Sequence, residues 1–180
     1  MLTGQNWERT AHTLDGAEFR IRPIRPTDEQ LEREFIVGLS PESRYTRMMC
    51  AMREPSPELV HRFVNVDYHR DMAFVALVDA PAAQGLPPTP HIIGVARYAA
   101  DPTGPGGEFA VAVTDSWQSR GVGATLMRIL LEYAREHGFH DLHGEILSTN
   151  SHMIELARYL GMDTRLSKND SGIVEASRDL

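Results

Sequence analysis

A stretch with two glycines before an apolar run could bind an anion. Residues 115–127, DSWQSRGVGATLM, place Gly121 and Gly123 directly before apolar residues with helical spacing. The first amides of a helix have no partners within the helix, and the helix dipole adds positive potential there. Glycines let a phosphate approach these amides closely, and Arg120 can add a charged contact. The stretch therefore predicts an anion-binding turn, although a plain strand–helix connection would also favour glycine.

The spacing of these glycines differs from two common phosphate-binding motifs. The dinucleotide fingerprint G-x-G-x-x-G and the Walker A loop G-x-x-x-x-G-K both require a glycine at the position that Leu126 occupies. The pattern that remains is Q-x-x-G-x-G, which begins at Gln118. This pattern fits neither of the two nucleotide sites.

Two carboxylates on expected strands could act as a general base. Glu108 begins the run EFAVAV and shares a strand face with Ala110 and Ala112, because side chains alternate along a strand. Burial among small apolar groups raises the pKa of a carboxyl towards neutrality, which suits proton abstraction from an amine. The alternative is an exposed carboxylate at the end of a strand. Glu145, in LHGEILS, is a second candidate, but alternation turns it away from its apolar neighbours and favours a solvated role.

Histidine and cysteine give no sign of metal or thiol chemistry. His137, His140 and His143 lie across an expected helix end, turn and strand, without the i, i+4 spacing of a helical metal-binding pair. No metal site is therefore predicted. Cys50 is the only cysteine, and no base lies beside it in the sequence, so we predict a small buried hydrophobe.

Composition limits the classes of function. The chain has 180 residues, 42% of them hydrophobic and 24% charged, which predicts a soluble globular protein with one folded domain. The net charge of −7, without a basic stripe, argues against nucleic-acid binding. No apolar run reaches the length of about 18 residues that a membrane span needs. The N-terminus has no apolar core of the signal-peptide type, and with the single cysteine this predicts a cytoplasmic location.

Hydrophobic periodicity indicates the elements that position these residues. Residues 1–16 are polar and aperiodic and are predicted to be a flexible tail before a domain over 17–180. A strand is expected at 18–26. Three helices should follow, the first with a Thr27–Gln30 capping box and the others with Ser–Pro caps at Ser40 and Ser56. The expected helical segments are 31–39, 41–49 and 57–66.

The second half of the chain alternates between strands and helices. Three strands, 72–80, 91–100 and 108–114, should form an antiparallel meander with a hairpin loop at 81–90. The remaining expected elements are a helix at 126–137, a strand at 142–148, a helix at 151–161 and a strand at 172–180. This order predicts an α+β (mixed α/β) fold with a single twisted mixed sheet flanked by helices.

Several phrases of the sequence resemble a known superfamily. VTDSWQSRGVGATLM resembles the acetyl-CoA-binding motif of the GNAT superfamily of N-acetyltransferases, and EFAVAV and EILSTNSHMIELARYLGM resemble its flanking motifs. The resemblance extends from about Phe19 to the C-terminus. It is greatest to the acetyltransferase domain of bacterial Pat-type protein lysine acetyltransferases, through IRPIRPTDE, GLSPESRY, RFVNVDYHRDMAFVA, IIGVARY and LARYLGM.

The resemblance implies acetyl-CoA as cosubstrate, with no metal. The amides of residues 119–124 would hold the pyrophosphate, Gln118 and Arg120 would flank it, and the backbone at 111–113 would pair with the pantetheine arm. Asn150 matches a position that often contacts the cofactor, although it could equally cap the following helix. The implied cofactor residues are Val111, Ala112, Val113, Gln118, Ser119, Arg120, Gly121, Val122, Gly123, Ala124 and Asn150.

The resemblance also implies acetyl transfer to a primary amine through an ordered ternary complex. Glu108 matches the general base of Pat-type enzymes, and a backbone N–H near Val113 would stabilise the oxyanion. The acceptor would be a protein lysine, for instance on an acyl-CoA synthetase. Two alternatives remain open: a small-molecule amine or amino-acid acetyltransferase, and a non-catalytic CoA-sensing module. Pat-type enzymes often carry a large partner domain, for which 180 residues leave no room, and the oligomeric state is not indicated.

The sequence departs from the superfamily pattern at the leaving group. Many members place a tyrosine seven residues after the asparagine, where it protonates the departing thiolate. That position is Ala157 here, and two further residues turn Tyr159 by about 200° onto another helix face. A thiol with a pKa near about 8.5 can leave unaided. We predict that no tyrosine acts as an acid.

Overall fold

The computed structural model describes residues 7–80 and 88–180. The expected hairpin loop at 81–90 lies mostly outside the described residues. Five α-helices occur in the described part: α1 (Glu29–Gly38), α2 (Pro41–Met48), α3 (Pro57–Val64), α4 (Val122–Glu136) and α5 (Ser151–Tyr159). The strands are β1 (Arg9–His12), β2 (Glu18–Pro23), β3 (Asp71–Ala80), β4 (Thr89–Ala100), β5 (Gly106–Val113), β6 (Asp141–Leu147), β7 (Asp163–Leu166) and β8 (Ile173–Asp179).

All eight described strands belong to one mixed sheet. Their order is β1-β2-β3-β4-β5-β6-β8-β7. Every neighbouring pair is antiparallel except β5 and β6, which are parallel and are connected through α4. The predicted α+β class is confirmed, and so is the antiparallel meander of β3, β4 and β5.

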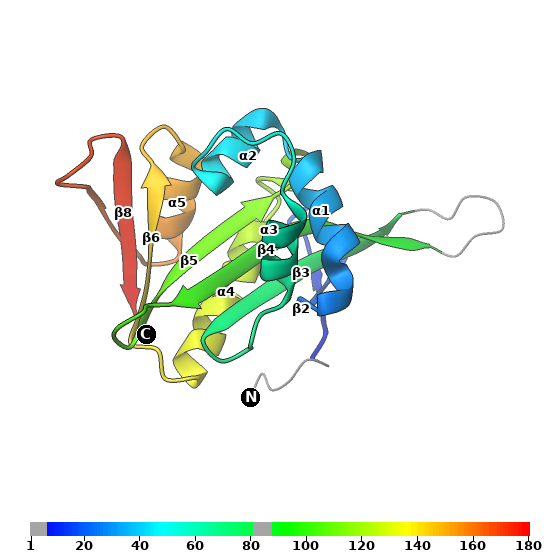
Figure 1. Cartoon of the computed structure of the whole chain (residues 1–180), viewed down its shortest axis with the longest axis horizontal. Helices are drawn as coiled ribbons and strands as arrows, with labels where there is room; N and C mark the ends of the chain where they lie inside the picture. The colour runs from blue at the N-terminus through cyan, green and yellow to red at the C-terminus, as the bar shows by residue number, and fades with distance from the viewer. Residues whose placement is uncertain (1–6, 81–87) are drawn as a thin grey trace.

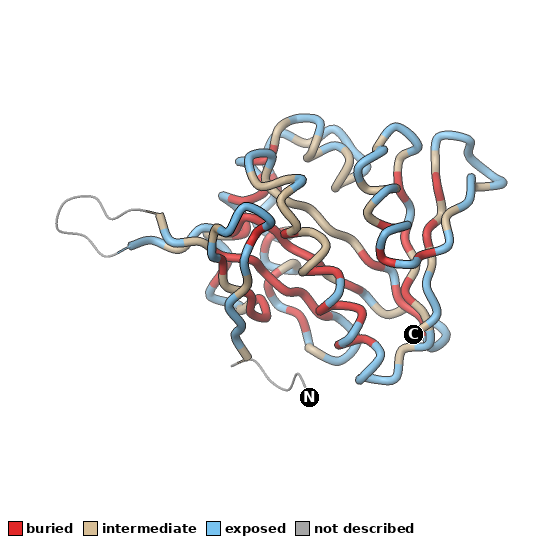
Figure 2. The backbone as a smooth tube through the Cα atoms, turned by 180° about the vertical axis from the view of Figure 1, so that it is seen from behind, coloured by how far each residue is buried: buried red, intermediate tan, exposed pale blue. Residues whose placement is uncertain are grey.

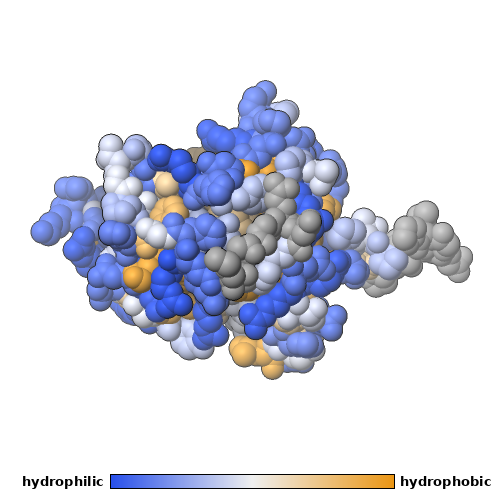
Figure 3. Space-filling view, turned by 90° about the horizontal axis from the view of Figure 1, so that it is seen from below, coloured by the Kyte–Doolittle hydropathy of each residue, from blue (hydrophilic) through white to orange (hydrophobic). Residues whose placement is uncertain are grey.

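The helices cover both faces of the sheet. Figure 1 shows α1, α2 and α3 on the near face and α4 behind the sheet. One core cluster joins the sheet to α4 and α5, and a second joins it to α1 and α3. Figure 2 shows the buried residues concentrated along the central strands and on α4, with exposed residues at the loops. The face seen in Figure 3 is mostly hydrophilic, with small scattered hydrophobic patches.

The helix starts follow the sequence in two of three cases. Ser40 Oγ accepts a hydrogen bond from Ser43 N at 3.1 Å, and Ser56 Oγ accepts one from Leu59 N at 3.2 Å, which confirms both Ser–Pro caps. The Thr27–Gln30 capping box is wrong. A 3-10 turn, Pro26–Asp28, precedes α1 instead, because the buried Asp28 pairs with the buried Arg22.

Two edge strands and one cysteine depart from the expectations. Arg9–His12 lies within the predicted tail but forms β1, which pairs with β2. Asp163–Leu166 forms β7 beside β8. Both are mainly exposed edge strands, so backbone pairing rather than an apolar pattern stabilises them. Cys50 is exposed, not buried, since it lies beyond the end of α2, whose C-cap Met49 is left-handed with a φ of +54°. Across the described ranges, no helix is long and apolar enough to cross a membrane.

Candidate active site

Strands β5 and β6 pair for only three residues and then part. Gly106, Gly107 and Glu108 pair with Asp141, Leu142 and His143, whereas β4 pairs with β5 as far as Val113. Residues 109–113 therefore have no strand partner on their β6 side within the described ranges. An extended ligand can pair with this open backbone edge, as an additional strand would.

The open edge exposes particular backbone groups. Thr114 N donates to Ile93 O of β4 at 2.9 Å. Because backbone groups alternate in direction along a strand, Val111 and Val113 direct their N–H and C=O groups away from β4, to the open edge. Ala112 directs its backbone groups to β4. The expected pantetheine pairing is therefore available at Val111 and at the N–H of Val113, whereas Val113 O accepts from Gln118 and the groups of Ala112 face β4.

A turn with free amides follows β5. A 3-10 turn, Asp115–Trp117, leads to Gly121, the N-cap of α4, whose φ is +89°. Ser119 is also left-handed, with a φ of +56°. No backbone N–H of residues 119–124 donates a hydrogen bond to another described residue. The turn has the free donors that an anion needs, at the positive end of a helix with 15 residues.

Side chains tie this turn to the rest of the protein. Gln118 Nε2 donates to Val113 O at 3.0 Å and to Ser43 Oγ at 3.1 Å. Arg120 lies over the Trp117 ring at 4.2 Å and forms an ion pair with Asp15. In this structure both predicted cofactor side chains are therefore engaged by protein groups.

The N-terminus of α2 is attached to the same turn. The Asp115 carboxylate accepts hydrogen bonds from Ser40 N at 3.0 Å, Ser40 Oγ at 2.8 Å and Ser43 Oγ at 2.9 Å. These bonds lower the pKa of Asp115 against the opposing effect of its partial burial. The carboxylate thus remains ionised and holds α2 beside the turn.

Asn150 acts as a helix cap. Its side-chain oxygen accepts a hydrogen bond from Met153 N at 3.1 Å at the start of α5. This is the second of the two roles expected for Asn150. Its amide nitrogen remains available to a ligand, so a cofactor contact stays a prediction.

Glu108 lies where β5 and β6 part. Its side chain shares the face of Ala112, which packs with the core beneath α1 and α3, and α2 lies against β5 on that side. The expectation that apolar neighbours bury this carboxylate is wrong, since Glu108 is exposed. The guanidinium of Arg47, on α2, lies within electrostatic range.

A charged cluster that the sequence did not predict lies on the same face of the sheet as Glu108. Arg97 of β4 lies 4.3 Å over the ring of Phe63, and Arg47 lies 5.6 Å from the same ring. Glu32 of α1 is buried, and this burial raises its pKa while Arg97 and Arg47 oppose the rise. Burial lowers the pKa of Arg97 to about 10, so Arg97 remains charged at neutral pH. The available sequence signal was Glu32 itself, one turn before Phe35 on the apolar face of α1.

The other residues considered lie outside this arrangement. Glu145 is exposed on β6. Tyr159 is 67% exposed, and its hydroxyl accepts a hydrogen bond from Arg128 at 2.6 Å on the surface. His143 contacts Asp141 and Asp101. Among the described residues, no three histidine, cysteine, aspartate or glutamate side chains gather as a metal site.

The chain is similar to known proteins over most of its length. The model of the acetyltransferase (GNAT) family matches residues 41–162. Acetyltransferase PA5475 of Pseudomonas aeruginosa is 34% identical over 170 residues, which cover 94% of this chain and 87% of that protein. The crystal structure of the GNAT domain of S. lividans PAT has a TM-score of 0.85 at 27% identity and covers 99% of both chains.

One relative is much longer than this chain. Acetyltransferase Pat of Mycolicibacterium smegmatis is 28% identical over 92% of this chain, but the match covers only 46% of that protein. The chain therefore spans about half the length of that relative. No property of the unmatched part of that relative is assigned to this chain.

Proposed function

Because the chain belongs to the acetyltransferase (GNAT) family and is an acyltransferase, we propose that it moves the acetyl group of acetyl-CoA to a protein lysine side chain, with Glu108 as the general base. The observation that carries this proposal is the turn at residues 119–124, whose free amides adjoin the open edge of β5. One end of this open edge then suits a diphosphate, and the other end holds the Glu108 carboxylate.

The proposed cofactor lies along β5. Its diphosphate contacts the amides of residues 119–124, and its pantetheine arm pairs with Val111 and Val113. Five strand residues separate Val113 from Glu108, which is about 17 Å at about 3.3 Å per residue. An extended pantetheine arm can cover this span and bring the thioester towards Glu108.

The proposed reaction needs one base and one oxyanion donor. Glu108 takes a proton from the acceptor ammonium, directly or through a water, and the neutral amine attacks the thioester carbon. The carbonyl oxygen gains negative charge and is stabilised by an outward backbone N–H of the open edge of β5 that the pantetheine arm leaves free. The C–S bond then breaks and the thiolate of CoA leaves without a tyrosine acid, while the second proton of the amine passes through solvent to the thiolate.

A protein acceptor is supported by the similarity to PAT and Pat over nearly the whole chain. Glu108 is exposed, so the ε-amine of a lysine on another protein can reach it. An acyl-CoA synthetase is the first candidate, by the resemblance of the sequence to Pat-type enzymes.

An acceptor screen tests the proposal. Purified protein is incubated with acetyl-CoA and with candidate proteins, free amino acids or simple amines. CoA release is followed with a thiol reagent, and acetyl-lysine is located by mass spectrometry. We expect acetylation of a protein lysine that disappears in Glu108→Gln. Turnover with small amines alone would mean that the acceptor is a small molecule rather than a protein. Tight CoA binding without any turnover would contradict the proposal that the protein is a catalyst.

A further inference from the structure

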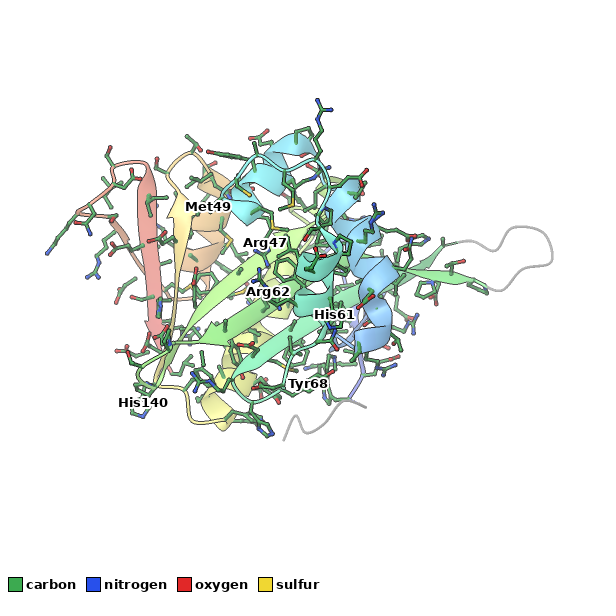
Figure 4. All side chains as sticks on the ribbon, in the orientation of Figure 1. Arg47, Met49, His61, Arg62, Tyr68 and His140 are labelled. Atoms are coloured by element: carbon green, nitrogen blue, oxygen red, sulfur yellow. The ribbon has the colours of Figure 1, made fainter. Side chains whose placement is uncertain are left out.

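Three arginines gather on the same face of the sheet as Glu108, where the proposed acceptor would bind. They are Arg47 of α2, Arg62 of α3 and Arg97 of β4, and we call them the arginine cluster. Figure 4 shows Arg47 and Arg62 between α2 and α3, over the central strands. The charges of Arg47 and Arg62 both act on Arg97, which places the three guanidinium groups in one region.

Aromatic and backbone contacts hold one side of this cluster in place. Phe63 contacts the guanidinium groups of both Arg97 and Arg47 through its ring. Arg97 Nη2 also donates to Phe63 O at 3.2 Å, while Arg97 Nη1 is buried and has no hydrogen-bond partner. Such stacking fixes the plane of a guanidinium and reduces the entropy lost when it binds a ligand.

The guanidinium groups of Arg47 and Arg62 form no close ion pairs with described residues. Neither makes a hydrogen bond, nor an ion pair within 4.0 Å, to any described residue. Glu32 acts on both Arg47 and Arg97, Glu108 also acts on Arg47, and Asp71 acts on Arg97. Burial raises the pKa of Glu32, and Arg97 and Arg47 oppose this rise.

These observations describe a receptive site for a carboxylate. Arg62 is exposed, so a ligand can reach its fork, whereas Arg47 is half-buried and burial lowers the pKa of its guanidinium. A guanidinium binds a carboxylate through two parallel hydrogen bonds. Arg47 also lies within electrostatic range of Glu108, so one acceptor can present an amine to Glu108 and a carboxylate to the arginines.

We propose that Arg47 and Arg62 bind a carboxylate of the acceptor, so that the enzyme prefers amines with an acidic group close by. This inference rests on the proposed function, because it places the reacting amine at Glu108. The carboxylate can come from an acidic residue beside the lysine of a protein or from the α-carboxylate of a free amino acid. The recognising chemistry is the same in both cases.

The test compares matched acceptors. Two peptides with blocked ends carry one lysine, flanked either by glutamate or by glutamine, and free lysine is compared with lysinamide. kcat/KM is measured from CoA release for the wild type, Arg62→Gln, Arg47→Gln and the control Arg135→Gln. Arg135 is an exposed arginine near the end of α4. Thermal unfolding identifies any variant that fails to fold, and Arg47→Lys then replaces Arg47→Gln.

We expect the wild type to prefer the acidic peptide by about tenfold, as charge-assisted hydrogen bonds would provide, and added salt to reduce this preference. The acidic-to-neutral ratio should approach one in Arg62→Gln and Arg47→Gln and persist in Arg135→Gln. A preference for free lysine over lysinamide, with none between the peptides, would support the site and assign it to an amino acid.

Equal kcat/KM values within both pairs of acceptors, with turnover intact, would overturn the arginine site and leave the proposed function standing. A preference that survives Arg62→Gln and Arg47→Gln would overturn it too. If no acceptor turns over, the proposed function fails separately. Calorimetry of the two peptides with the CoA-loaded protein then decides the inference, because equal affinity contradicts it and tighter binding of the acidic peptide supports it.

Discussion

Arg120 Nη2 lies 2.8 Å from Asp15 Oδ2, although 105 residues separate the two in sequence. Leu14 N also donates to Arg120 O at 3.0 Å. A Cβ on Gly121 would lie 3.4 Å from the Leu14 side chain. The loop between β1 and β2 therefore supports the turn at residues 119–124 (the glycine turn) directly, and two residues expected to lie in a tail contact this candidate site.

Glu108→Gln should abolish most of the acetyl transfer and retain acetyl-CoA binding. A general base contributes a factor of about 100 or more to the rate, and glutamine cannot accept the amine proton. CoA release measures the rate, and calorimetry measures binding. Glu145→Gln, on β6, is the matched control and should keep its activity. Comparable losses of activity in both variants would contradict the role of Glu108 as the general base.

Gly121→Ala should weaken acetyl-CoA binding by about tenfold or more, since the free amides can no longer hold their arrangement and hydrogen bonds to charged groups contribute about 1.5–3 kcal/mol each. The φ of +89° at Gly121 disfavours any side chain. Gly138→Ala is the control, with a φ of +82° and open space around the added Cβ. The two variants should lose similar stability, measured by thermal unfolding. Unchanged CoA affinity in Gly121→Ala would rule out the turn as the diphosphate site.

Tyr159→Phe should leave the chemical step nearly unchanged. The Tyr159 hydroxyl accepts a hydrogen bond from Arg128 on the surface, and Ala157 occupies the position of the usual acid. Single-turnover kinetics at saturating acetyl-CoA measures the step. A fall of about a hundredfold, as expected on loss of a general acid, would show that Tyr159 protonates the thiolate.

Asp28→Ala should destabilise the protein by about 3–5 kcal/mol, because it leaves the charge of Arg22 buried without a partner. Arg22 donates to Asp28 at 2.6 and 2.9 Å, and both side chains are buried. The exposed pair of Arg20 and Asp79 provides the control, and Asp79→Ala should cost less than about 1 kcal/mol. Urea unfolding measures both. Equal losses in the free energy of unfolding would mean that burial of an ion pair does not determine the cost of breaking it.

Glu32→Gln should change how stability depends on pH. Burial raises the folded-state pKa of Glu32 above the usual 4.5, so the folded state keeps a proton that the unfolded chain releases. The stability of the wild type therefore falls as the pH rises from the unfolded to the folded pKa. Glu32→Gln cannot release this proton, so its stability relative to that of the wild type should increase as the pH rises. Urea unfolding between about pH 5 and about pH 8 checks this, and a constant difference would contradict it.

The sequence predicted the elements whose apolar period is strong and the turn whose glycines are distinctive. The meander, the Ser–Pro caps at Ser40 and Ser56 and the start of α5 at Ser151 all depend on neighbouring residues. The parting of β5 and β6 could not be predicted, because pairing registers are set by contacts between distant segments. Position alone likewise suggested burial for Glu108, which is exposed.

The arginine cluster shows the same limit. Arg97 and Phe63 lie 34 residues apart, and only the packing of α3 on the sheet brings them together. No periodic signal marks such a pair. Asn150 illustrates a different limit, since capping and cofactor binding favour the same residue type at the same position.

The hydrogen bonds from Ser40 and Ser43 to Asp115 make α2 and the glycine turn a single mechanical unit. Arg47 lies on that helix, so we expect its position to depend on the turn at residues 119–124, where we propose that the diphosphate binds. Attempts to engineer new acceptor selectivity by remodelling α2 will therefore also alter nucleotide affinity, and both properties must be optimised together.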